Sequence, residues 1–214
     1  IGDKPVLAHV LDRCDQIVGI NKVICAVADT PGNEVLLDII ANCGVEAFPG
    51  SEADPLSRTL GAAKAAGCMA LDDLVMRVTS DCPMVDPDVC GAVLNLAKES
   101  THRGSVYVSN LTPRTFPQGL DCEIVRWQDL QEANSGAFSS HDREHVMPYI
   151  QRRATNLNYA HTEDLSHLRW TLDHPSDLAF MRSLATLAGK LPLEMSETLA
   201  ILEAYPSLRN DNQS

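Results

Sequence analysis

Two aspartates follow apolar, β-rich segments of the chain. Asp81 comes after the run 74–79 and Asp173 after the run 168–172, and each has a proline two residues further on. In open α/β sheets, ligands bind at the carboxyl ends of the strands. Mg²⁺ prefers one or two carboxylates together with substrate phosphates and water. The two acids therefore predict a magnesium site, although each could instead cap the next helix, a reading that Pro175 strengthens for Asp173.

A proline-rich stretch at 113–123 carries the second group of candidates, in the string PRTFPQGLDCE. Its two prolines would hold the loop rigid, so that Arg114 could make a bidentate contact to a carboxylate or a phosphate. Gly119 would allow a ligand to approach the backbone closely. Asp121 and Glu123 alternate, so they point to the same side of a strand. The alternative is an exposed hairpin whose charges are solvated.

A third group lies in the string HDREH at 141–145. His141 and His145 are four residues apart and share one face of a helix, which is the spacing of two zinc ligands. The third ligand and the glutamate position of a zincin helix are absent, so zinc is disfavoured. We expect a helix start from which Arg143 and Glu144 reach a ligand or a neighbouring subunit.

The elements that must position these side chains alternate along the chain. Short β-rich runs are separated by patterns of helical periodicity, which predicts βαβ crossovers. The expected strands are 22–28, 45–48, 74–79, 105–109, 120–125, 157–160 and 168–172, and helices are expected to start near 5, 33, 51 (capped by Ser51), 86, 175 and 195. The fold class is α/β, three-layered, with a mostly parallel sheet. Residues 1–214 form one domain in which 110–153 is an insertion or flap.

Composition excludes several classes of protein. The 17 basic against 29 acidic residues give a net charge of −12, which argues against a nucleic-acid-binding surface. No run approaches the ~20 apolar residues of a membrane span. The seven cysteines are scattered and never spaced C-x-x-C, as expected for reduced thiols in the cytoplasm. The motifs of dinucleotide-binding, P-loop and serine-hydrolase sites are missing.

Four strings, in order along the chain, resemble one family, the spore-coat-polysaccharide-type cytidylyltransferases, which are related to the CMP-sialic acid (acylneuraminate) and CMP-Kdo synthetases. The strings are RVTSDCPMVDPDV (77–89), VSNLTPRTFPQGLDCEI (108–124), DREHVMPYI (142–150) and RWTLDHPSDLAFMR (169–182). The segment 44–67 shares the likeness, so that it extends from residue 4 to about residue 182.

The resemblance implies a nucleotide-diphospho-sugar transferase fold and a reaction that joins CMP from CTP to a sugar or sugar acid, with release of pyrophosphate. It implies that Asp81 and Asp173 hold Mg²⁺ at the triphosphate, and that Asp177 belongs to a helix start. The substrate-binding candidates are Arg114, Gln118, Gly119, Asp121, Glu123, Arg143, Glu144, His145 and Arg169. A homodimer through 110–153 is expected by resemblance.

Members of this family begin with a strand and a glycine- and arginine-containing loop that cradles the nucleotide. This sequence starts after that position, at Ile1-Gly2-Asp3-Lys4-Pro5, so we expect the first central strand and the phosphate loop to lie outside it. Two other hypotheses stay open. One is an inactive nucleotide- or sugar-binding module of the same fold. The other is a metal-dependent glycosyltransferase, although the string Asp81-Cys82-Pro83 does not supply the usual D-x-D.

Overall fold

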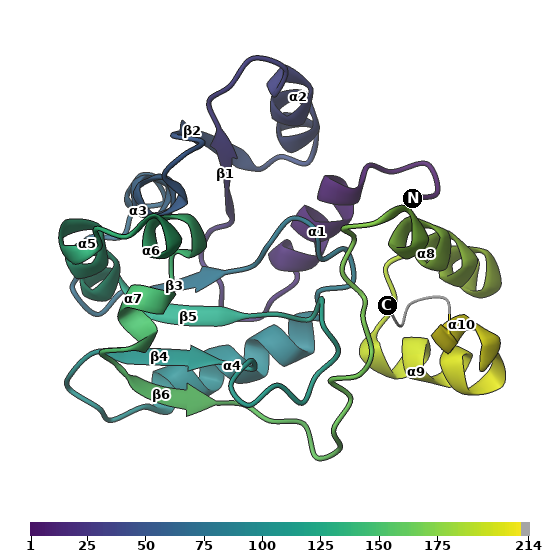
Figure 1. Ribbon diagram of the computed structural model, residues 1–214. Helices are drawn as coiled ribbons and strands as arrows, with labels where there is room; N and C mark the ends of the chain where they lie inside the picture. The colour runs from purple at the N-terminus through teal and green to yellow at the C-terminus, as the bar shows by residue number, and fades with distance from the viewer. Residues whose placement is uncertain (211–214) are drawn as a thin grey trace.

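The computed structural model describes residues 1–210 and has alternating helices and strands (Figure 1). The strands are β1 (Ile24–Ala28), β2 (Glu46–Gly50), β3 (Leu74–Arg77), β4 (Val106–Ser109), β5 (Glu123–Arg126) and β6 (Thr155–Asn158). The helices are α1 (Val6–Asp15), α2 (Glu34–Asn42), α3 (Pro55–Ala65), α4 (Pro87–Glu99), α5 (Trp127–Gly136), α6 (Ser140–His145), α7 (Pro148–Gln151), α8 (Pro175–Ala188), α9 (Met195–Ala204) and α10 (Ser207–Asn210). The predicted α/β class is confirmed.

The strands form two sheets that differ from the single, mostly parallel sheet that was expected. β1 and β2 make a parallel pair, and the other four strands are ordered β3-β5-β4-β6. β5 runs antiparallel to both of its neighbours, whereas β4 and β6 are parallel. The reason is the connection between β4 and β5, which contains no helix and brings the chain back in the opposite direction.

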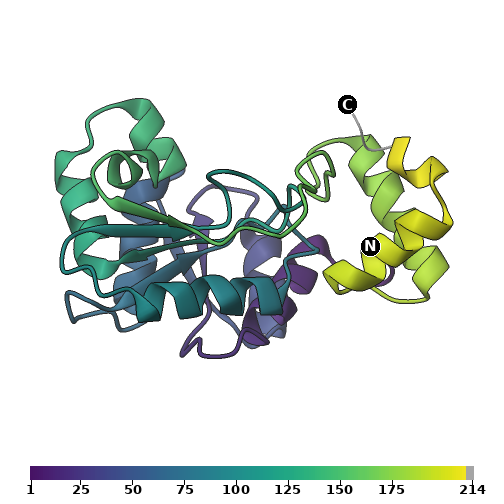
Figure 2. The same ribbon diagram turned by 90° about the horizontal axis from the view of Figure 1, so that it is seen from below.

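Helices cover both faces of the four-stranded sheet, as the three-layer prediction required. Val108 and Ile124 pack into one core cluster with α4, whereas Tyr107 and Val125 pack into another with α5 and α7. This division follows from the period of two along a strand. Figure 2 shows α4 along one side of the sheet and the green helices of the 127–151 region on the other.

The segment 110–153 does not behave as a flap outside the core. It supplies β5, which lies between β3 and β4, and Ile124 of that strand is fully buried. It also supplies α5 and α7, which pack against the sheet. Its sequence looked like an insertion because its helices are short and polar on their outer faces, but the strand it carries is central.

The expected strand at 168–172 does not form. A single parallel bridge joins Gln118 to Arg169, with Gln118 N–H donating to Leu168 O (2.9 Å) and Trp170 N–H to Gln118 O. The loop 113–119 and the extended segment 168–173, called the strap below, therefore support each other. β6 also starts two residues earlier than the strand predicted at 157–160.

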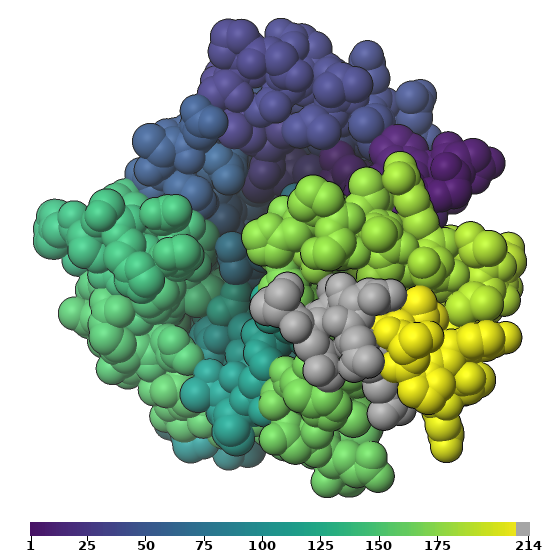
Figure 3. All heavy atoms as spheres, turned by 45° about the vertical axis from the view of Figure 1, so that its right-hand side comes forward, coloured from purple at the N-terminus to yellow at the C-terminus, as the bar shows by residue number. Residues whose placement is uncertain are grey.

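The C-terminal helices lie at one end of the molecule (Figure 2). α8 and α9 share a cluster with Trp170 of the strap, and Ile1 packs against it. Figure 3 shows the purple N-terminal residues beside the yellow-green segment that contains α8. Arg13 of α1, 2% exposed, donates from Nε to Val85 O (2.6 Å) and from Nη1 to Glu194 Oε1 (2.8 Å). This buried guanidinium ties α1 to the start of α9.

The helix starts follow their capping residues. Asp86 caps α4 as predicted, accepting from Asp88 N–H (2.9 Å), with Pro87 at the first helical position. α3 begins later than predicted, because its cap is Asp54, which accepts from Ser57 N–H (3.0 Å), and not Ser51. Across residues 1–210, no helix combines the length and apolar character needed to cross a bilayer.

Candidate active site

The two predicted acidic loops meet through their backbones. Leu172 N–H donates to Asp81 O at 2.8 Å, and the Thr171 hydroxyl lies 3.4 Å from the same oxygen. The Asp81 side chain is half-buried, and its carboxylate contacts the Cys82 thiol at 3.5 Å. Among the side chains of residues 1–208 it takes part in no ion pair. Its oxygens are therefore available to a cation.

Asp173 sits at the other side of this junction and is bound by an arginine. Arg169 Nη2 hydrogen-bonds Asp173 Oδ2 and also Asp177 Oδ2, the latter at 3.1 Å. Asp177, 1% exposed, accepts from the N–H groups of Asp173 and His174, both at 2.8 Å. Asp177, and not Asp173, therefore caps α8, which leaves the exposed Asp173 carboxylate free of that role.

The charges around Asp177 are matched inside the protein. Burial opposes ionisation of this carboxyl, but the hydrogen bonds from Arg169 and from two backbone N–H groups hold its pKa below the usual value. The hydrogen bond to Asp177, together with the one to Asp173, in turn raises the pKa of Arg169. The ion pair between Arg169 and Asp177 thus holds Asp173 in place, through its side chain and its backbone N–H.

Arg114 and Asp121 form a bidentate pair within the loop 113–123. The two N–O distances are 2.6 and 2.9 Å, and both side chains are about 30% exposed. The hydrogen bonds to Asp121 raise the pKa of Arg114. Arg114 was predicted to bind a substrate carboxylate or phosphate. In this structure both of its Nη atoms donate to Asp121. A substrate must therefore either displace Asp121 from Arg114 or bind to the two side chains together.

Gly119 permits a close approach, but to the protein itself. Its φ is +105°, and a Cβ placed there would lie 2.5 Å from the carbonyl carbon of Trp170 and 2.6 Å from the nitrogen of Thr171. We predicted that the backbone of Gly119 faces a ligand. In the structure it instead contacts the backbone of the strap. The Gln118 side chain is half-buried, while its backbone makes the bridge to the strap.

Glu123 belongs to a network that the sequence analysis missed. It accepts from Arg77 Nη1 and from the Tyr107 hydroxyl, each at 2.8 Å. Burial, reinforced by the charge of Glu123, raises the pKa of Tyr107. Arg77 stood in the string RVTSDCP, but its partner 46 residues away was not visible in the local sequence.

The buried thiol of Cys82 lies beside Asp81, and the strap connects the Asp81 loop to the loop 113–123 through hydrogen bonds at Leu172 and Gln118. Burial raises the pKa of Cys82 to about 12, and the negative charges of Asp81 and Asp121 add to this effect. Both carboxylates therefore act on one buried group. The backbones of the Asp81 loop, the strap and the loop 113–123 thus meet in one region, although Asp173 does not follow a strand as the strand-end argument assumed.

The helix α6 holds the remaining candidates, and its contacts are different. Arg143 donates to Asp54 Oδ2 (2.8 Å from Nε) and to the carbonyl oxygens of Asn134 and Ala137, both at 3.1 Å. These bonds lock α6 onto the start of α3. Glu144 and His145 are exposed, and the rings of His141 and His145 stack edge to face with centroids 4.5 Å apart.

Asp81 and Asp173 carry donor atoms of the kind that a hard divalent cation binds, and Arg169 already hydrogen-bonds the Asp173 carboxylate. Both offer carboxylate oxygens, the donors that Mg²⁺ prefers, and neither is used as a helix cap. A second acidic group, Asp86, Asp88 and Glu194, has its oxygens within 4.8 Å of one another. Arg13 pairs with two of these acids, Glu194 at 2.8 Å and Asp86 at 3.8 Å, so the two have a structural role.

Fold and site together define an α/β protein of the nucleotidyltransferase type, with two acidic loops meeting at one edge. The model of the cytidylyltransferase family matches residues 1–202, and the chain belongs to that family. A solved cytidylyltransferase from Leptospira borgpetersenii serovar Hardjo-bovis is 25% identical with a TM-score of 0.90, covering 100% of this chain and 89% of its own.

Two further proteins are similar to this chain, one in structure and one in sequence. A CMP:2-keto-3-deoxy-manno-octonic acid synthetase, solved in complex with CTP, is 16% identical with a TM-score of 0.61, over 88% of this chain and 90% of its own. An uncharacterized protein of Methanocaldococcus jannaschii is 23% identical over 219 residues, covering 100% of this chain and 86% of that protein. These likenesses support the nucleotidyltransferase-like fold on which the site is built.

Proposed function

We propose that the protein transfers CMP from CTP to a hydroxyl of a sugar or sugar acid and releases pyrophosphate, as a step in the synthesis of surface polysaccharides. Membership of the cytidylyltransferase family supports the reaction class. The observation that carries the site is the hydrogen bond from Leu172 N–H to Asp81 O, because it joins the two acidic loops at one edge.

In the proposed reaction the acceptor oxygen forms a bond to the α-phosphorus of CTP while the bond to the β-phosphate oxygen breaks. The hydroxyl proton passes to water, and pyrophosphate leaves with the bonding electron pair. Such reactions depend mainly on positioning and on neutralising charge at the phosphoryl oxygens. A net charge of −12 would repel a triphosphate, so the protein needs cations at this place.

We assign Mg²⁺ to Asp81 and Asp173, where it would neutralise charge on the triphosphate oxygens. Asp81 offers carboxylate oxygens that no arginine or lysine side chain of residues 1–208 occupies. Asp173 is held in place by Arg169, which is itself fixed by Asp177. The ion pair between Arg169 and Asp177 thus orients the Asp173 carboxylate.

We assign the acceptor to the loop 113–123 and the network behind it. The pairs Arg114–Asp121 and Arg77–Glu123 present two carboxylates and two guanidinium groups that can exchange partners with the hydroxyl or carboxyl groups of a sugar acid. Arg143 is assigned a positioning role, because its donors are occupied by α3 and α5. Glu144 and His145 remain candidates only through their exposure on α6.

The test is pyrophosphate release measured with each of the four ribonucleoside triphosphates, with Mg²⁺ or a chelator. The acceptor panel contains 3-deoxy sugar acids, other sugar acids and neutral sugars. We expect release only with CTP, Mg²⁺ and one acceptor class, and loss of it in Asp81→Asn. Asp38→Asn, an exposed acid on α2, is the matched control and should retain full activity.

Two outcomes would contradict the proposal. Release that is equal for all four nucleotides would remove the cytidylyl assignment. Tight binding of CTP or a sugar without any turnover would favour a binding module of the same fold.

A further inference from the structure

The outer face of α6 carries two exposed histidines whose rings touch. His141 and His145 are four residues apart, and their ring centroids lie 4.5 Å from each other. Within the described side chains, residues 1–208, neither ring makes a hydrogen bond to another residue. Both imidazoles therefore have ring nitrogens available to a ligand from outside the chain.

The helix that carries this pair is fixed to the rest of the protein. Ser139 caps α6 by accepting from Asp142 N–H at 3.1 Å, and the Asp142 carboxylate pairs with Arg152 at 2.8 Å. Arg143 Nε donates to Asp54 at 2.8 Å and holds α6 against the start of α3. Figure 1 shows α6 beside α3 and α5. A ligand on the outer face would need to reorient two imidazole rings, without refolding the helix.

Two imidazoles at this spacing suit a transition-metal ion such as Zn²⁺. Imidazole nitrogens bind Zn²⁺ tetrahedrally at about 2.0–2.1 Å, so that two rings on one ion have centroids roughly 5 Å apart. The observed separation of 4.5 Å is close to this, and a small rotation of the rings would be sufficient. Mg²⁺ prefers oxygen ligands, so this pair differs in metal preference from the two acidic loops.

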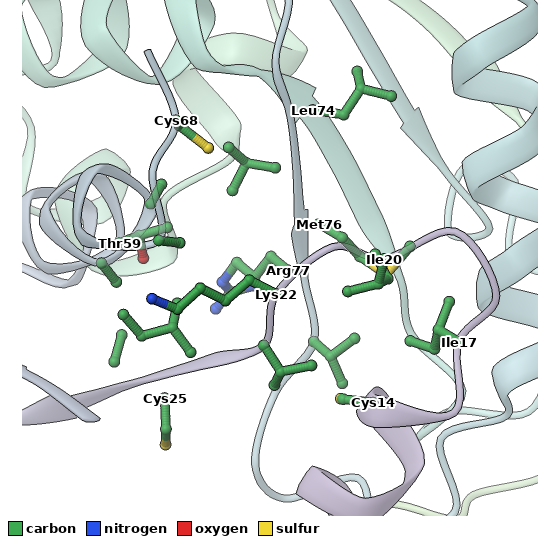
Figure 4. Close-up of a pocket in the computed structure, with 18 of the residues that line it drawn as sticks. Cys14, Ile17, Ile20, Lys22, Cys25, Thr59, Cys68, Leu74, Met76 and Arg77 are labelled. Carbon is green, nitrogen blue, oxygen red and sulfur yellow. The ribbon is translucent and has the colours of Figure 1, made fainter. Parts of the chain in front are cut away.

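The thiols, the other ligands that such a metal prefers, do not offer an alternative place. Cys14, Cys25 and Cys68 line a cavity of about 780 Å³ between β1 and β3. Figure 4 shows these three thiols on different sides of the cavity. Cys90 and Cys122 are fully buried in the apolar core, out of reach of an ion from solution.

One chain supplies only half of a zinc site. Structural zinc sites hold four protein ligands in a tetrahedron. Among the described residues, no third histidine, cysteine or carboxylate joins His141 and His145 in a group of possible metal ligands. The remaining ligands must come from outside the chain. A second copy carries the same pair, and a twofold axis through the ion would bring four imidazoles together.

The surface beside the pair also fits a second copy. Phe138, three residues before His141, is 91% exposed, and an aromatic ring is stabilised when a contact removes it from water. Two copies that each carry a net charge of −12 repel each other. A divalent cation held by neutral imidazoles would place positive charge between them and fix their relative orientation.

We infer that His141 and His145 form half of a Zn²⁺ site, which the same two residues of a second copy complete, so that the ion joins two chains through α6. This site is separate from the proposed magnesium site in both position and ligand type. It gives His145, a substrate-binding candidate only through its exposure, a role between copies of the chain.

The test combines sedimentation velocity of the untagged full chain in EDTA, Mg²⁺ or Zn²⁺ with calorimetric titration of Zn²⁺. We expect single chains in EDTA and in Mg²⁺, two-chain particles in Zn²⁺, and one zinc ion bound per two chains. His141→Ala and His145→Ala should each weaken zinc binding roughly tenfold or more and remove the two-chain particle. His102→Ala removes an exposed histidine outside α6 and should change neither result.

Three results would overturn the inference. One zinc ion bound per single chain would mean that water, and not a second copy, completes the site. Two-chain particles of equal strength in EDTA would show that the contact does not need the metal. Zinc-dependent association that persists in His141→Ala, or that continues beyond two chains, would assign it to adventitious binding of the ion. None of these measurements requires CTP or turnover, so they are separate from any failure of the proposed function.

Discussion

The two acidic loops of the candidate site are built differently. Asp81 lies in the loop just beyond β3, which ends at Arg77, and its carboxylate is half-buried without an ion pair among the side chains of residues 1–208. Asp173 lies on the strap, which forms no strand, and is supported by Arg169, Asp177 and the start of α8. One ligand is therefore positioned by a sheet and the other by a network of charges. This difference predicts that substitutions around Asp173 change stability and activity together, whereas substitution of Asp81 changes activity alone.

The largest effect is expected from Asp81→Asn. Loss of a metal ligand should lower CTP turnover roughly a thousand-fold, equivalent to about 4 kcal/mol in the activation barrier. The free energy of unfolding, measured by urea denaturation, should change by less than about 1 kcal/mol, because the described contact of the side chain is one long hydrogen bond from the Cys82 thiol. A large loss of stability would show that Asp81 is a structural residue and not a ligand.

Gly119→Ala is expected to displace the strap, because Gly119 lies against the backbone of Trp170 and Thr171. The new Cβ would lie 2.5 Å from the Trp170 backbone, so the strap must move, at a cost of about 3 kcal/mol in unfolding free energy. Gly67→Ala is the matched control, because Gly67 has φ +104° and no atom within 4 Å of the added Cβ. The difference between the two variants measures the contact with the strap. Equal losses would refute the positioning role of Gly119.

Asp177→Asn tests the support beneath Asp173. The substitution removes a buried charge that Arg169 neutralises, and we expect a loss of about 2 kcal/mol of stability together with reduced activity. Glu197→Gln is the control, because Glu197 caps α9 at the same helical position but pairs with the exposed Lys190. It should cost less than about 1 kcal/mol. If both variants lose the same stability, the Arg169 pair adds nothing beyond capping.

Lowering the pH should weaken the interaction between Asp177 and Arg169 and reduce the free energy of unfolding by about 1 kcal/mol. The folded pKa of Asp177 lies below its unfolded value of about 3.9, so its stabilisation is complete above that value. It is lost as the pH falls through the folded pKa. Urea denaturation from pH 5 to pH 2 should therefore show a steeper loss in the wild type than in Asp177→Asn. Parallel curves would mean that Asp177 is not ionised by this network.

Local signals in the sequence were sufficient for many elements. Asp86 followed by Pro87 marked the start of α4, and the period of two placed Ile124 and Val125 on opposite faces of β5. The loops that carry Asp81 and Asp173 do meet, but through the hydrogen bond from Leu172 N–H to Asp81 O and not through two neighbouring strand ends, because no strand forms before Asp173.

Long-range partners could not be predicted. The run 168–172 looks like a strand, but it pairs only through Gln118, so it stays an extended strap. Arg143 looks like a ligand-binding arginine until Asp54, 89 residues away, is placed beside it. Glu123 likewise depends on Arg77. The spacing of residues within a motif carries no information about such pairs.

The most direct test of the account is calorimetric titration of CTP into the protein, with and without Mg²⁺, for the wild type and for Asp81→Asn, Asp173→Asn and the control Asp38→Asn. The account predicts that binding requires Mg²⁺ and weakens at least tenfold in Asp81→Asn and Asp173→Asn, with Asp38→Asn unchanged. Binding of CTP that is independent of Mg²⁺, or equal in all four proteins, would contradict the claim that the two acidic loops form one metal and nucleotide site.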